Sequence, residues 1–164
     1  MITIQFNDEA LQAGLDRLAL AVTDLTRFMS GIGDDMVAST KARFISGVGP
    51  DGTSWAPKSQ TTLDNYKRRG ENPDPRPLWG PSGDLHTLFA VEAGPDSVSW
   101  GTNVIYSAVM QFGAAKGAFG NDAGGSPIPW GTIPARPFLG LADEDRSGIE
   151  AALEEWLTRA WGPD

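Results

Sequence analysis

The side chains that could do chemistry are few and scattered along the chain. His86 is the only histidine. A lone histidine can act as a general base, but no convincing nucleophile or orienting carboxylate lies near it in the sequence. We therefore interpret His86 as a surface or loop side chain. Ser82-Gly83-Asp84 lacks the G-x-S-x-G frame that exposes a nucleophilic serine, so it does not indicate a hydrolase site.

Two further clusters have a structural explanation that is simpler than a ligand site. The acidic triplet Asp143-Glu144-Asp145 could bind a divalent cation, but its position at the start of an expected helix explains it through capping and the helix dipole. The segment from Gly113 to Gly117 lacks the spacing of a phosphate-binding loop. The chain has no cysteine, which excludes disulfides, thiolate catalysis and zinc–thiolate sites. The sequence thus predicts no catalytic residue, no metal site and no cofactor.

The formal net charge of -8 disfavours conventional binding of duplex DNA, which depends on an excess of basic side chains. Lys67-Arg68-Arg69 could contact phosphates, but such a run is more often solvated, or paired with acidic neighbours in an oligomer. No apolar stretch approaches the roughly 20 residues of a membrane span, and the N-terminus does not read as a signal peptide. We expect a soluble protein, or part of a soluble assembly, without a membrane partner.

The elements that position these side chains are predicted from hydrophobic periodicity. Residues 2–6 alternate as a short strand, and Asn7 is a plausible helix cap. Apolar residues spaced by four and three over residues 11–29 predict a long amphipathic helix, kinked or interrupted at Gly31 and Gly33 and continuing to about residue 45. We expect its apolar face to pack in the core or against another subunit, rather than to form an autonomous coiled coil.

The middle of the chain is rich in turn residues. Pro50-Asp51-Gly52 predicts a turn in which Pro presets φ and Gly accepts a positive φ. A short helix is expected near residues 61–69 and a β-hairpin over about 87–102, while residues 106–112 fit either a short helix or a third strand. The Gly/Ala-rich segment starting at residue 114 predicts a mobile loop.

The C-terminal part is expected to contain an edge strand over residues 137–141, followed by a helix that Asp143 caps and Gly162 ends. The expected fold is one α+β domain over residues 1–164, with loops at about 71–81 and 114–127. This fold consists of a long N-terminal helix, a small and mostly antiparallel sheet, and a C-terminal helix packed on that sheet. Some of the six tryptophans are expected in the core and others in subunit interfaces.

Several short segments follow one another in an order that resembles the sequence pattern of a known protein family. The most specific of them is Ala135-Arg136-Pro137-Phe138-Leu139-Gly140. Over roughly residues 40–157 the succession resembles the phage virion morphogenesis (tail-completion) family of Mu-like and related tailed bacteriophages. The segments are Phe44, Pro50-Asp51-Gly52, Trp55-Ala56-Pro57, Thr61-Thr62, Ser82-Gly83-Asp84-Leu85, Gly101-Thr102-Asn103, Tyr106-Ser107-Ala108, Gln111-Phe112-Gly113 and residues 133–141.

The resemblance implies a structural virion protein and not an enzyme. It implies a subunit of a hexameric tail-terminator ring at the head–tail junction, which caps the tail tube and joins it to the head connector. DNA would pass through the lumen without sequence-specific binding, and part of the acidic C-terminal surface, or the acidic residues of a loop, is expected to line that channel so that DNA does not stick. The alternatives are a tail assembly factor that forms no major ring or, from another class, a metal-dependent nucleic-acid hydrolase.

The residues expected to build the scaffold or the subunit interface come from the same segments. For Arg136 two alternatives stay open: a bidentate bond to a carboxylate across a subunit boundary, or a salt bridge within the chain. Phe138 is expected to anchor the segment in the core. The full set of candidates is Pro50, Asp51, Gly52, Trp55, Tyr106, Gln111, Phe112, Gly113, Arg136, Pro137, Phe138 and Leu139.

Overall fold

The computed structural model describes residues 8–72 and 74–162. The strand expected at residues 2–6 and the cap expected at Asn7 lie outside these ranges. The elements, in chain order, are α1 (Glu9–Ala21), α2 (Thr26–Ser46), α3 (Gln60–Arg68), α4 (Asp84–Thr87), β1 (Ala90–Ala93), β2 (Val98–Gly101), α5 (Ser107–Phe112) and α6 (Asp143–Trp161). Helices combined with a small antiparallel sheet confirm the expected α+β class.

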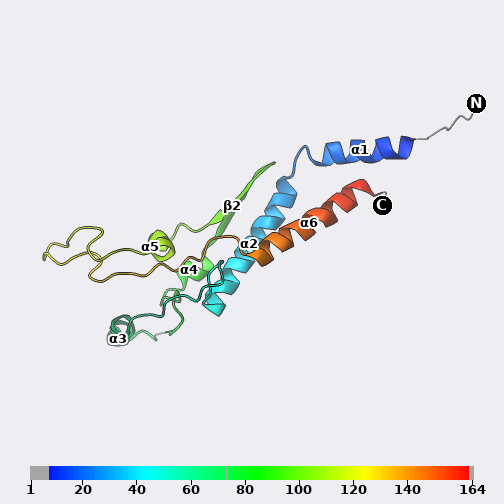
Figure 1. The fold of residues 1–164 in the computed structure, drawn as a ribbon. Coiled ribbons are helices and arrows are strands. Elements are labelled where there is room, and N and C mark those ends of the chain that lie inside the picture. The colour runs from blue at the N-terminus through cyan, green and yellow to red at the C-terminus, as the bar shows by residue number, and fades with distance from the viewer. Residues whose placement is uncertain (1–7, 73, 163–164) are drawn as a thin grey trace, which may run out of the picture.

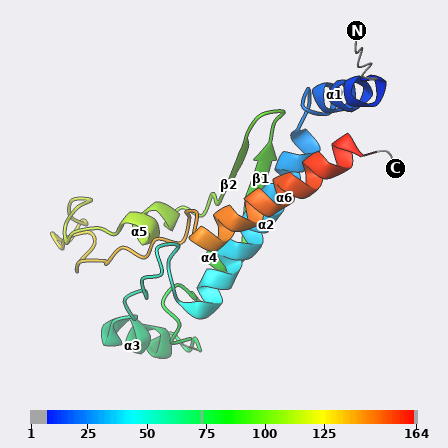
Figure 2. The ribbon, with the colours of Figure 1, turned by 45° about the vertical axis from the view of Figure 1, so that its right-hand side comes forward.

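The molecule is elongated, and α2 forms its axis (Figure 1). Helix α6 runs beside α2, and the β1–β2 hairpin also lies along α2 (Figure 2). One end of the molecule carries α1 and the C-terminal half of α6, which pack against each other. The other end carries α3 and the long loop that follows α5.

The expected long N-terminal helix is divided, but not at the two glycines. The break falls between Ala21 and Thr26, whereas Gly31 and Gly33 lie inside α2. Asp24 explains its position, because its carboxylate accepts a hydrogen bond of 2.8 Å from the backbone N–H of Thr26 and so competes with a continuous helix. The glycines stay helical because the packing of α2 outweighs their low helix propensity.

The hairpin predicted over residues 87–102 is confirmed, with Val91 opposite Trp100 and Ala93 opposite Val98. Its partner differs from the expectation. The C-terminal helix was expected on the sheet, but α2 packs on both strands while α6 packs on α1 and α2. The reason is Gly33, a buried residue of α2 that allows the side chains of Val91 and Val98 to approach the helix backbone.

Filling this contact is expected to destabilise the fold. A Cβ atom at Gly33 would lie 2.9 Å from Val98 Cγ2 and closer still to Val91 Cγ1. Overpacking of this kind costs about 1–3 kcal/mol, which exceeds the roughly 1 kcal/mol that alanine gains in helix propensity. Gly33→Ala should therefore lower the free energy of unfolding measured by urea titration.

Gly31 provides the matched control, since it lies in the same helix with nothing within 4 Å of a Cβ position. Gly31→Ala should leave stability unchanged or raise it by up to about 1 kcal/mol. Equal effects of the two substitutions would contradict the close contact between α2 and the hairpin.

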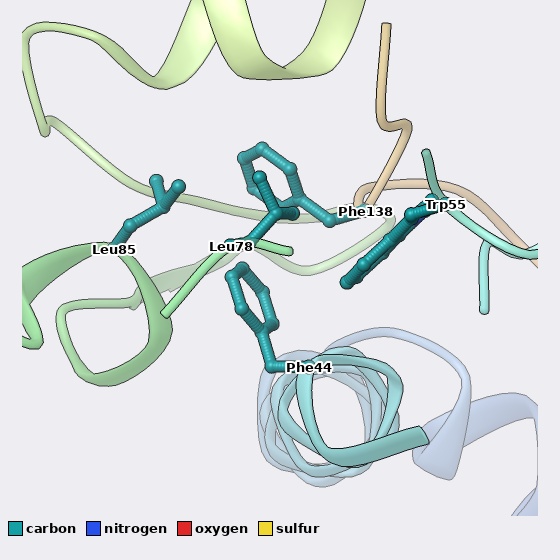
Figure 3. Close-up of a cluster of buried hydrophobic side chains, with 5 residues drawn as sticks. All are labelled: Phe44, Trp55, Leu78, Leu85 and Phe138. Atoms are coloured by element: carbon teal, nitrogen blue, oxygen red, sulfur yellow. The ribbon is translucent and has the colours of Figure 1, made fainter. Parts of the chain in front are cut away.

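The core lies between the C-terminal half of α2, the turn after it, α4 and the segment before α6. Its buried side chains are Phe44, Trp55, Leu78, Leu85 and Phe138 (Figure 3). The ring of Phe44 lies 5.4 Å from the ring of Phe138 and 5.6 Å from that of Trp55, centre to centre. Phe138 is completely buried, which confirms the anchoring role expected for it.

Hydrogen bonds define three local features that the sequence left open or placed elsewhere. Residues 107–112 form a helix and not a third strand. The Gly/Ala-rich loop folds back on itself, and antiparallel bridges pair Ala114 with Ile133 and Asn121 with Pro127. At the start of α6 the cap is Ala142 and not Asp143, because the carboxylate of Asp145 accepts the Ala142 N–H at 2.8 Å.

Candidate assembly site

Residues 136–140 form the centre at which the candidate segments meet. This stretch was expected to be an edge strand, but it pairs with no strand. Its backbone groups are bound by side chains from distant parts of the chain, and by the backbone of Met110, which accepts the Arg136 N–H at 2.8 Å. The prediction of a strand was wrong because side chains take the place of a neighbouring strand.

Gln111, on α5, binds this segment as a second strand would. Its side-chain oxygen accepts the N–H groups of Phe138 and Leu139 at 2.9 and 3.0 Å. Its Nε2 donates to the carbonyl oxygen of Leu139 at 2.9 Å. Three backbone groups are thus satisfied by one amide, which uses both of its polar atoms.

Arg43, on the buried face of α2, holds the carbonyl side of the segment. Its Nη1 donates to the carbonyl oxygens of Phe138 and Gly140, at 3.0 and 2.8 Å. Its Nη2 forms an ion pair with Asp145, and both side chains are less than a tenth exposed. Asp145 also accepts a hydrogen bond of 2.5 Å from the hydroxyl of Ser39. The ion pair therefore ties α2, the segment and the start of α6 together.

Arg136 forms no salt bridge with a described carboxylate, and its bond to a carboxylate across a subunit boundary stays a prediction. Its guanidinium is buried and donates to the carbonyl oxygens of Ala56 and Pro57, at 2.7 and 2.9 Å. Trp55 completes this contact, because its indole N–H donates to the carbonyl oxygen of Pro137 at 2.9 Å. Arg136 and Trp55 thus join the segment to the turn after α2, through carbonyl oxygens and not through a carboxylate.

The turn at Pro50-Asp51-Gly52 is formed as expected, with Gly52 at a φ of 77° and Asp51 accepting the Thr53 N–H at 3.0 Å. It packs directly on the segment, since a Cβ at Gly140 would lie 2.8 Å from Pro50 Cγ. Gly113, directly after α5, makes a similar close approach to the backbone that precedes Arg136. Its φ is 75°, and a Cβ there would meet the backbone of Ile133 and Ala135 at 2.8 Å. Both close approaches depend on the absence of a side chain.

The structure separates the candidate residues into two groups. Trp55, Arg136 and Phe138 are buried, and Pro50, Gln111, Gly113, Pro137 and Leu139 are half-buried around them. Asp51, Gly52, Tyr106 and Phe112 are exposed, with Phe112 78% exposed. The second group is the more accessible to another molecule.

Sequence reasoning missed Arg43 and the partner role of Asp145. A signal was present, because Arg43 follows Met36 and Thr40 on the apolar stripe of its helix, where a charge requires a buried partner. Nothing in the local sequence identified which of the many acidic residues that partner is.

A hollow of about 750 Å³ opens beside this centre, between α3, the loop before α4, α5 and the segment before Arg136. Its apolar lining includes Leu78, Leu85, Met110 and Ile133. Its polar rim carries side chains of Lys58, Tyr66, Arg69, Glu71 and Tyr106. The hollow combines an apolar floor with a rim on which basic groups outnumber acidic ones.

The loop beside the hollow is held by charged groups. Lys58 donates to the carbonyl oxygens of Asp74, at 2.6 Å, and of Trp79, and burial lowers the pKa of its ammonium group. Arg76 hydrogen-bonds the carboxylate of Asp74, which lowers the pKa of Asp74 to about 2. The guanidinium of Arg76 also lies 3.3 Å from the centre of the Trp79 ring.

His86 is not the simple surface side chain that the sequence suggested. Its ring stacks on Trp79 at 3.8 Å between centres, and its Nδ1 is buried without a hydrogen-bond partner among the described residues. Burial lowers the pKa of this imidazole, and the positive charge of Arg76 lowers it further, against a smaller opposing effect of Asp74. His86 is therefore held in its neutral form as part of the packing around Trp79.

The pH dependence follows from this lowered pKa. Between the folded pKa and the unfolded value near 6.5, the unfolded chain binds more protons, so the free energy of unfolding should rise with pH across that window. NMR titration should place the pKa of the single histidine below 6.5. Arg76→Gln should raise this pKa, and His86→Phe should remove its contribution to the pH dependence. A titration midpoint at or above 6.5 would contradict the packing described here.

The described residues offer neither a cluster of metal ligands nor a membrane-spanning helix. No group of three or more His, Asp or Glu side chains gathers closely enough to hold a metal ion. Within the same residues, every helix is too short or too polar to span a lipid bilayer.

Comparison with known protein families gives a match over most of the chain. The model of the phage virion morphogenesis family matches residues 6–158, nearly the whole chain. No curated protein and no solved structure matches the chain.

Proposed function

Because the chain belongs to the phage virion morphogenesis family, and so has a structural or assembly role in a phage particle, we propose that it is the tail-terminator subunit. In this proposal, copies of the chain close into a hexameric ring at the head–tail junction. The ring caps the tail tube, joins it to the head connector and surrounds the DNA channel. Its work is mechanical and not catalytic.

The supporting observation is an excess of accessible surface. A compact monomer of 17.5 kDa would expose about 7,900 Å², whereas this chain exposes 11010 Å². The ten residues outside the described ranges would account for at most about half of the difference, at the roughly 1.45 Å² per dalton of an unfolded chain. About 1,500 Å² is left, which is the area that two interfaces of about 800 Å² per subunit would cover. A ring subunit has two such interfaces.

The side chains on this surface favour the same proposal. Among the described residues, Ile105 is 96% exposed, Phe112 78% and Trp130 62%. Aromatic side chains are enriched in protein–protein interfaces, which suits the exposed rings of Phe112 and Trp130. The net charge of -8 suits a wall that DNA passes without binding.

A null allele of the gene, complemented in trans, tests this function. Electron microscopy of the null lysate should show filled heads separate from tails, with tail tubes of irregular length. The wild-type gene should restore joined particles of uniform tail length. Normal particles without the protein, or a block before heads are filled, would contradict a role as tail terminator.

A further inference from the structure

The two ends of the elongated molecule carry opposite charge. At one end, residues 58–76 contain five basic side chains against three acidic ones. At the other end, α1 and residues 150–161 of α6 contain five acidic side chains against two basic ones. The two groups lie at opposite ends in both views (Figures 1 and 2).

These charges cannot satisfy each other within one molecule. Helix α2 lies between the two ends, and its 21 residues span about 30 Å. Salt screens exposed charges beyond about 8–10 Å at physiological ionic strength. The attraction between the two ends is therefore available only to a second molecule.

Both ends also expose apolar surface. On α6, Leu153, Leu157 and Trp161 are each about two-fifths exposed, and Leu15 on α1 is 52% exposed. At the other end lies the hollow with its apolar floor, bordered by α3, which has no buried residue of its own. A helix end with apolar side chains among carboxylates is complementary to an apolar hollow with a basic rim.

We propose that the α1–α6 end of one copy docks on the hollow beside α3 of a second copy, with carboxylates of α6 facing the basic side chains of α3. This contact rests on the proposed ring and specifies its interface. Each copy uses two different surfaces, so the contact repeats head to tail and closes when the rotation between copies permits. Glu150 and Glu154 of α6, and Lys67 and Arg68 of α3, are exposed and lie outside the network that holds the core.

Complementary charge reversal tests the contact. Variant A carries Lys67→Glu and Arg68→Glu, and variant B carries Glu150→Lys and Glu154→Lys. Each variant alone places like charges at the contact and should associate about a hundredfold more weakly than the wild type. An equimolar mixture of A and B should recover association, because each reversed end then meets its reversed partner. Native mass spectrometry and sedimentation velocity give the readout.

A matched control separates the contact from net charge. Asp34→Lys with Asp35→Lys changes the charge by the same amount as variant B, at exposed positions of α2 away from both ends. This control should associate like the wild type. Unchanged association of A and B, or no recovery in their mixture, would overturn the proposed contact. If variants A and B both still formed rings, the proposed contact would be wrong and the proposed function would stand.

Cysteine cross-linking gives an independent readout, since the chain has no cysteine. A mixture of Lys67→Cys and Glu154→Cys proteins should form covalent dimers with a short bismaleimide reagent, at a rate at least about tenfold above that of either protein alone. The Asp34→Cys protein, mixed with either one, should stay at the background rate. Equal cross-linking in all mixtures would contradict the head-to-tail contact. In a variant that carries both Lys67→Cys and Glu154→Cys, cross-linked species that never exceed two copies would support the contact and contradict the closed ring.

Discussion

Arg43→Met is expected to lower the free energy of unfolding by about 3–5 kcal/mol, because it leaves the buried carboxylate of Asp145 without its ion-pair partner. The substitution also removes the donor that binds the carbonyl oxygens of Phe138 and Gly140. Urea titration followed by tryptophan fluorescence, at a fixed protein concentration, measures the loss.

The second arm of this experiment removes both charges. Arg43→Met combined with Asp145→Leu should recover much of the stability lost in Arg43→Met, since a buried ion pair replaced by apolar groups is often close to neutral. Arg159→Met is the control, because Arg159 pairs with Glu155 on the exposed side of α6. It should change stability by less than about 1 kcal/mol. A loss in Arg43→Met no larger than in Arg159→Met would contradict a buried, tightly coupled pair.

Phe138→Ala is expected to cost about 3–5 kcal/mol, because this side chain is completely buried between Phe44 and Phe89. The cavity it leaves lies under the segment that Gln111, Arg43 and Trp55 hold in place. Thermal unfolding and urea titration should agree on the loss.

Phe112 provides the matched control, since it is the same residue type at 78% exposure. Phe112→Ala should change the stability of the isolated chain by less than about 0.5 kcal/mol. Similar losses in the two variants would show that Phe138 is not the centre of the core. A loss of assembly in Phe112→Ala without a loss of stability would indicate that this ring lies in a subunit contact.

The elements with a clear period or turn chemistry were predictable. The hairpin, the turn at Pro50-Asp51-Gly52 and the two terminal helical regions follow from spacing and from residues with restricted backbone angles. The break at Asp24 was missed because its cause is a local hydrogen bond from a backbone N–H to the Asp24 side chain. Of the two glycines that attracted attention, Gly33 serves the packing of α2 on the hairpin. Periodicity identifies a helix more reliably than it identifies where the helix is interrupted.

The membership of the candidate site was predictable in part, but its arrangement was not. Gln111, Arg136 and Phe138 do meet, although no sequence pattern indicates that an amide and two guanidinium groups would replace a strand. Side chains that bind distant backbone groups have no characteristic spacing, because their partners are set by the tertiary fold. In α1 the sequence pattern was clear but the packing differs. The four-and-three repeat of its leucines predicted a buried face, and most of these leucines are exposed in the isolated chain.

Native mass measurement of the purified protein, alone and mixed with tail tubes, tests the central proposal most directly. We predict a closed hexamer that remains attached to one end of the tubes. A protein that stays a single chain in the presence of tubes, and leaves their ends free, would contradict the account.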